Sequence, residues 1–140
     1  PLRGVLSMLA PALSQPSLPA CVFGSAEDKA ACAASLDCSP ADLAIARQRV
    51  AEDPGLEIPA FKFSHDRLSP DARFERLRKE FGDAFVPFVI DSGPDNPNGY
   101  DESSHAVFSA HYSHRAGTPT REAYDRLLAY FQRRLLSANT

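Results

Sequence analysis

"EIPAFKFSHDRLSPDARFERLRKEF" (residues 57–81) predicts a strand, a tight turn and a helix in succession. Two phenylalanines alternate about Lys62, which is the period-two pattern of a strand. After a short polar turn, Ser69 can cap a helix and Pro70 suits its first position. Apolar residues at helical spacing then continue as far as Gly82, which favours a helix end. The stretch is therefore typical of one strand–helix unit of an α/β protein.

The same alternation of strands and helices continues on both sides of this unit. The sequence predicts strands near residues 10–14 and over 84–91, and helices over 26–36, 39–52 and from 118 onward. Strands that alternate with helices imply parallel strands joined by crossovers. We therefore expect an α/β fold with about three parallel strands and flanking helices, in a single domain over residues 1–140. Pro87 favours an edge position for the last strand, because proline lacks a ladder donor.

Composition and charge exclude several classes of function. A formal net charge of −3 over 140 residues gives no electrostatic basis for binding nucleic acid. No apolar run is long enough to cross a bilayer, so we expect no membrane association. Cys21, Cys32 and Cys38 are an odd set without a CxxC pair. They indicate reduced thiols in a cytoplasmic protein, with a disulfide between two of them as the alternative.

Two titratable residues follow the predicted strands at their carboxyl ends, where open parallel sheets place their ligands. Asp66 follows the strand of residues 57–64, and His105 lies in the long loop after residues 84–91. An aspartate followed by a loop histidine is the acid-then-base order of the α/β-hydrolase triad. In that reading His105 takes the proton of a nucleophile, and Asp66 fixes its tautomer. The alternative is that Asp66 is a turn residue and His105 an ordinary loop histidine.

Most of the chain resembles the carboxyl-terminal half of a dienelactone hydrolase-like α/β hydrolase. The matching stretches, in the family's order, are "LSQPSLP" (13–19), "SPADLAIARQRV" (39–50), "FKFSHDRLSPDARFERLRKEFGDAF" (61–85), "IDSGPDNPNG" (90–99), "SSHAVFSAHY" (103–112) and "TPTREAYDRLLAYFQRRL" (118–135). The resemblance implies Asp66 as the triad acid and His105 as the triad base. It also implies a small ester or lactone as substrate and no cofactor.

The chain departs from that family at the nucleophile. No G-x-C-x-G or G-x-S-x-G elbow is present, and the three cysteines fall after the place where the elbow belongs. The chain begins at Pro1 without a methionine, which favours a fragment of a longer hydrolase over a truncated relative. We expect no ester hydrolysis by the 140 residues alone. The alternative function is a non-catalytic α/β module that assembles, for example as a homo-oligomer, through an exposed sheet edge.

A metal site is the main rival interpretation of the histidines. His65, His105, His111 and His114 could join Asp66 around a cation. No recognised ligand spacing connects them, so the sequence favours no metal. His65 is expected beside the acid, and His111 and His114 are expected in surface loops. Tyr100 could line a pocket, although a surface position is the simpler expectation.

Overall fold

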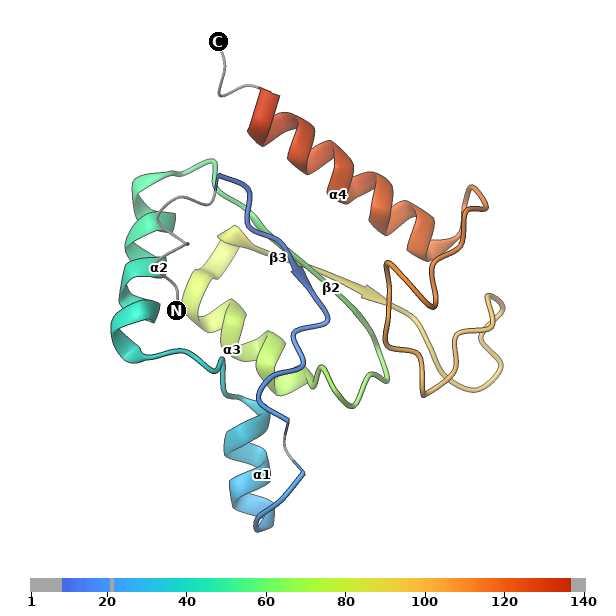
Figure 1. Ribbon diagram of the computed structural model, residues 1–140, viewed down its shortest axis with the longest axis horizontal. Helices are drawn as coiled ribbons and strands as arrows, with labels where there is room; N and C mark the ends of the chain where they lie inside the picture. Colours follow the sequence, from blue (N-terminus) through green and yellow to red (C-terminus); the bar gives the residue numbers. More distant parts are fainter. Residues whose placement is uncertain (1–8, 21, 137–140) are drawn as a thin grey trace.

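The fold is known from a computed structural model, which describes residues 9–20 and 22–136 (Figure 1). Three strands alternate with helices along this part of the chain. The elements in order are β1 (Leu13–Ser14), α1 (Ala26–Ala33), α2 (Pro40–Glu52), β2 (Ile58–Phe63), α3 (Asp71–Phe81), the short 3₁₀ turn η2 (Gly82–Ala84), β3 (Phe85–Ile90) and α4 (Pro119–Leu136). This is the α/β architecture that the sequence predicts.

The three strands form one parallel sheet in the order β1-β2-β3. In the register, Ala60 lies opposite both Leu13 and Pro87. The central strand β2 is buried along its whole length, as expected of a strand covered on both faces. β3 is an edge of the described sheet, so the position predicted from Pro87 is confirmed.

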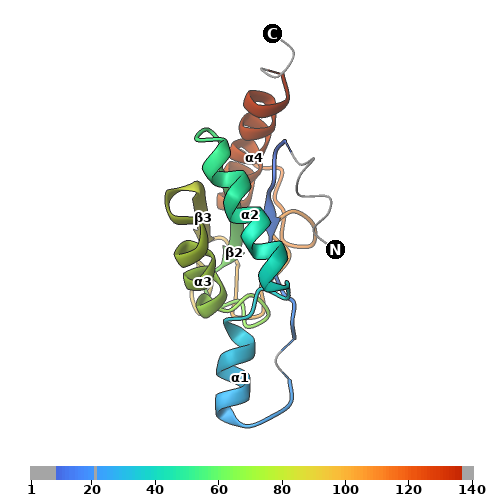
Figure 2. The same ribbon diagram turned by 90° about the vertical axis from the view of Figure 1, so that its left-hand side faces the viewer.

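Alternate residues of β2 build two separate cores. Phe61 and Phe63 pack in one cluster with Ala123 of α4 and with Tyr100 and Val107 of the loop before it. The neighbouring Ala60 packs instead with Phe74, Leu77 and Phe85. Because successive side chains of a strand point to opposite faces, α3 and α4 cover opposite faces of the sheet. In both ribbon views α1 projects away from this layered body (Figures 1 and 2).

Serine caps begin two of the helices. The Ser25 side chain accepts a hydrogen bond from the backbone N–H of Asp28, and Ser39 does the same for Asp42. The prediction that Ser69 caps α3 is wrong. The N-cap residue of α3 is Pro70, and no side chain makes a capping hydrogen bond there. The backbone N–H of Ser69 instead donates to the carboxylate of Asp66. The turn before α3 is therefore organised by Asp66.

The cysteines differ from the expectation of three reduced thiols. Cys32 is disulfide-bonded, whereas Cys38 is free. Cys21 lies outside the described residues. The prediction is therefore wrong for Cys32, and spacing alone could not have shown it. Among residues 9–20 and 22–136, no helix has the length and apolar character needed to cross a membrane.

Tyr130 joins α4 to the residue before β2 by a hydrogen bond, and its burial makes the fold less stable at alkaline pH. Its hydroxyl donates to the carbonyl oxygen of Glu57 at 2.6 Å, and burial raises the pKa of Tyr130 from 10.0 to about 12. The folded chain therefore holds this proton more tightly than the unfolded chain. The resulting stabilisation is complete below pH 10 and is lost as the pH rises from 10 to about 12.

We expect the melting temperature of the wild type to fall more steeply between pH 10 and 12 than that of Tyr130→Phe. At pH 8 the variant should be less stable by about 1 kcal/mol, because it lacks one hydrogen bond. Thermal melts followed by circular dichroism measure both effects. Tyr124→Phe, on the same helix, is the control and should keep the wild-type slope. Equal slopes for the wild type and Tyr130→Phe would contradict the assignment.

Candidate active site

Asp66 lies in the turn that follows β2 and is almost fully buried, at 4% exposure. One carboxylate oxygen, Oδ1, accepts hydrogen bonds from the backbone N–H groups of Leu68 at 3.0 Å and Ser69 at 3.2 Å. The backbone N–H of Asp66 donates to the carbonyl of Phe63 at 3.3 Å. The carboxylate therefore shapes the turn with one oxygen and leaves Oδ2 for another partner.

A buried lysine fixes this turn from the other side. Lys62 is 1% exposed, and its ammonium donates to the carbonyl of Ser69 at 2.6 Å and to Oδ1 of Asp71 at 2.7 Å. It also lies 5.3 Å from the centre of the Phe74 ring. Lys62 thus connects β2 to the start of α3 through the hydrogen bonds of its buried side chain. It limits movement of Asp66.

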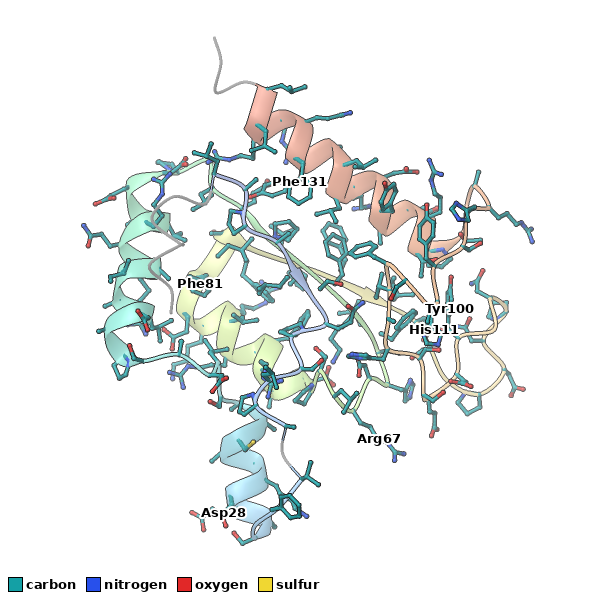
Figure 3. All side chains as sticks on the ribbon, in the orientation of Figure 1. Asp28, Arg67, Phe81, Tyr100, His111 and Phe131 are labelled. Carbon is teal, nitrogen blue, oxygen red and sulfur yellow. The ribbon has the colours of Figure 1, made fainter. Side chains whose placement is uncertain are left out.

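His105 is presented by the loop between β3 and α4, and Tyr100 anchors that loop in the core. The Tyr100 side chain is buried, and its hydroxyl is 2.9 Å from Oγ1 of Thr120. Its backbone carbonyl accepts from Gly93 at 2.8 Å. The expectation of a surface tyrosine is therefore wrong. Figure 3 shows Tyr100 beside His111, and both rings contact Phe63.

The structure brings Asp66 and His105 together. Nδ1 of His105 is 2.7 Å from Oδ2 of Asp66. The carboxylate side chain is 2% exposed and the imidazole is 32% exposed. Because an ionised carboxylate can only accept, the Nδ1–H tautomer donates to it and leaves Nε2 with a free lone pair. This is the arrangement in which a histidine can accept a proton at Nε2.

The group that faces Nε2 is the hydroxyl of Ser17, which the sequence did not single out. Oγ of Ser17 is 3.3 Å from Nε2 of His105, although the two residues are 88 positions apart. Oγ also donates to the carbonyl of Gln15 at 2.7 Å. Ser17 lies in a proline-containing loop without a glycine elbow around it, so its sequence does not mark it as a nucleophile. Its position directly after the predicted first strand was the available signal.

Arg73 of α3 clamps the loop that carries Ser17. The residue is 1% exposed, and its guanidinium donates to the carbonyls of Pro16 at 2.7 Å and Pro19 at 2.9 Å. It also donates to the carbonyls of Ser35 at 2.9 Å and Cys32 at 3.4 Å. Burial lowers the pKa of Arg73, and the charge of Asp37 opposes that effect. The clamp holds the backbone on both sides of Ser17.

Two open clefts meet beside these side chains. One, of about 320 Å³, is lined by Asp66, Arg67, Leu68, Glu102, Ser103 and His105. The other, of about 150 Å³, is lined by Ser17, Pro19, Ala20, Val22, Ala33, Arg67, Leu68, Pro70 and Arg73. Arg67 and Leu68 form part of both walls. The histidine thus faces one cleft and the serine faces its neighbour.

The remaining histidines do not join this pair. Nδ1 of His65 is 3.1 Å from Oγ of Ser64, and its ring packs against Gly93. His111 is half-buried and accepts from the backbone N–H of Ala106 at 3.2 Å, so it is not a free surface residue. The His114 ring contacts Tyr112. Over the described part of the chain, no group of three or more histidine, cysteine or acidic side chains is arranged to hold a metal ion.

Comparisons with family models, with curated proteins and with solved structures found no match to this chain. The class that can be stated is therefore an α/β protein with a three-stranded parallel sheet. The resemblance to dienelactone hydrolases stays a prediction from the sequence.

Proposed function

We propose that the chain carries the acid–base pair of a carboxylic ester or lactone hydrolase of the dienelactone hydrolase type. The observation that carries the proposal is the 2.7 Å contact between the buried Asp66 carboxylate and Nδ1 of His105. The pair lies at the carboxyl end of the central parallel strand, where ligands of such sheets bind. His105 acts as the general base and then as the general acid, and Asp66 orients the imidazole and stabilises its cation.

The proposed substrate is a small ester or lactone, acted on without a cofactor. A nucleophile on a glycine elbow would be supplied by sequence beyond these 140 residues, as in a longer hydrolase of which this chain is a part. A truncated relative that has lost turnover is the other form of the same proposal. A cytoplasmic location was predicted from reduced cysteines, and the disulfide of Cys32 weakens it because disulfides are rare in reducing compartments.

The test uses the complete reading frame that encodes the chain. The proposal expects a strand followed by G-x-C-x-G or G-x-S-x-G before Pro1. The full-length protein should hydrolyse p-nitrophenyl acetate or a dienelactone with turnover. His105→Ala should lower kcat by about 100-fold or more, since general-base catalysis contributes 10²–10⁴-fold.

His114→Ala is the matched control and should leave kcat unchanged, because the His114 ring contacts Tyr112 rather than the pair. A reading frame without the elbow, combined with a full-length protein that shows no turnover, would refute the proposal. Turnover that survives in His105→Ala would refute it as well.

The second candidate is assembly through the sheet edge. Among the described residues β1 pairs only with β2. Beside it lies an apolar groove of about 220 Å³, lined by Pro11, Ala12, Leu13, Leu36, Cys38, Leu43, Ala46, Ile58, Leu77 and Phe81. Sedimentation velocity over a concentration series decides this candidate. A mass that rises with concentration, and that Leu43→Lys returns to one chain, supports it; a constant mass of one chain excludes it.

A further inference from the structure

We propose that Ser17 is a nucleophile served by the Asp66–His105 pair and that it takes up a small acyl group. The inference rests on the proposed function, because it needs the pair to act as an acid–base couple. It goes further by assigning the proton donor of the 140-residue chain to one of its own residues, which lies at Nε2 where the elbow nucleophile of the longer hydrolase would lie. Ser17, His105 and Asp66 form a continuous series, with 3.3 Å from Oγ to Nε2 and 2.7 Å from Nδ1 to Oδ2.

The hydrogen-bonding state of the series fits proton transfer. Since Asp66 holds the Nδ1–H of His105, Nε2 of the neutral imidazole can only accept. The Ser17 hydroxyl has one proton and two acceptors within reach, the Gln15 carbonyl at 2.7 Å and Nε2 at 3.3 Å. The hydrogen bond of the hydroxyl can pass from the carbonyl to the imidazole. This needs only rotation of the side chain about Cα–Cβ or a change in the direction of the O–H proton. Such loose spacing is common in sites without substrate and tightens when a ligand binds.

The backbone around Ser17 is held as a nucleophile requires. Arg73 binds the carbonyls of Pro16 and Pro19 on either side of Ser17. Gln15 has a φ of 42°, in the left-handed region that non-glycine residues seldom adopt. The backbone N–H of Gln15 donates a hydrogen bond to the carbonyl of Phe61, in the central strand, at 2.9 Å. A strained turn directly after a strand, fixed by a buried cation, places a short hydroxyl with little freedom.

The two clefts define the ligand. The Ser17 cleft of about 150 Å³ has mainly apolar walls and admits a short, uncharged acyl group. The neighbouring His105 cleft of about 320 Å³ has Arg67, Glu102 and Ser103 in its wall and suits a polar leaving group. Arg67 borders both clefts, but its side chain is 85% exposed. A solvated cation stabilises an oxyanion weakly, so the chain should react slowly and near stoichiometrically instead of turning over rapidly.

An activated probe would react with Ser17 by displacement of a leaving group. Oγ of Ser17 attacks the phosphorus of an alkyl fluorophosphonate, the O–P bond forms and the P–F bond breaks. Fluoride leaves, and the hydroxyl proton passes to Nε2 of His105 and then to solvent. With p-nitrophenyl acetate the same step forms an acetyl ester on Ser17 and releases p-nitrophenolate.

The experiment measures the rate of fluorophosphonate labelling on the 140-residue chain by intact mass, with the site assigned by peptide mass spectrometry. We expect one phosphonyl group per chain, on Ser17, and no label in Ser17→Ala. His105→Gln should slow labelling by about 100-fold. Ser109→Ala, an exposed serine of the His105 loop, should label like the wild type. Circular dichroism melts show that each variant is folded.

The outcomes separate the inference from the proposed function. His105-dependent labelling at another residue would overturn the role of Ser17 and leave the pair intact. Labelling at Ser17 that is as fast in His105→Gln as in the wild type would overturn the action of the pair on Ser17. No labelling at all would overturn the inference alone, because hydrolysis by the full reading frame is decided separately.

Discussion

Arg73→Met should lower the free energy of unfolding by about 3 kcal/mol. Four backbone carbonyls would lose a charged donor, and each bond of this kind contributes about 1.5–3 kcal/mol. Part of that loss is offset, because the buried cation is costly to desolvate and the methionine is not. The melting temperature should fall by roughly 10 °C in a thermal melt.

The matched control is Arg78→Met, on the same helix. Arg78 is exposed and lies over the Phe85 ring at 5.8 Å, an interaction of about 0.5–1 kcal/mol. The melting temperature of Arg73→Lys should lie between those of the two methionine variants, since one ammonium group cannot reach all four carbonyls that the guanidinium binds. If Arg73→Met melts within about 2 °C of Arg78→Met, the clamp does not stabilise the fold.

Asp66→Asn should slow the labelling of Ser17 by about 100-fold, as much as His105→Gln, because the amide leaves Ser17 without a base. The backbone N–H groups of Leu68 and Ser69 point at Oδ1 and will select the amide oxygen at that position. The amide nitrogen then faces Nδ1 of His105, which must become an acceptor. The imidazole proton moves to Nε2, and Ser17 loses its base.

Nitrogen-15 NMR of the imidazole reports this change directly. The wild type should show the proton on Nδ1, and Asp66→Asn should show it on Nε2. Asp101→Asn is the control: Asp101 also accepts a backbone N–H, from Ser103 at 2.8 Å, but no bond joins it to His105. It should keep the wild-type tautomer and rate. An Asp66→Asn protein that retains the Nδ1–H tautomer would rule out the proposed role of the carboxylate.

The sequence predicts the layered α/β fold because strong local signals mark its elements. The alternation about Lys62 gives β2, and Pro87 correctly marks an edge strand. Two of the errors have different causes, one local and one distant in the sequence. Ser69 has the sequence of a helix cap, yet Asp66 takes its backbone N–H. Tyr100 lies in a loop without periodicity, and its burial follows from Thr120.

The sequence also predicts some residues of the candidate site and misses others. Asp66 and His105 could be inferred because each follows a strand end, and the topology of a parallel sheet brings strand ends together. The signal for Ser17 is weaker, because it also follows a strand but no glycine motif surrounds it and its contact with His105 spans 88 positions. The carbonyl clamp of Arg73 is equally invisible in sequence, where the residue resembles one more charge on a solvated helix.

α1 is attached to the rest of the fold near its carboxyl end. No residue of α1 is buried, so the helix contributes no side chain to either core. Near its end the backbone is joined to α3 through the carbonyls of Cys32 and Ser35, both held by Arg73. We therefore expect the unit to open locally, so that its amide protons exchange with solvent without global unfolding of the sheet. Residues 25–35 are thus expected to have low local stability, and Arg73 and the disulfide of Cys32 both link this segment to the rest of the chain.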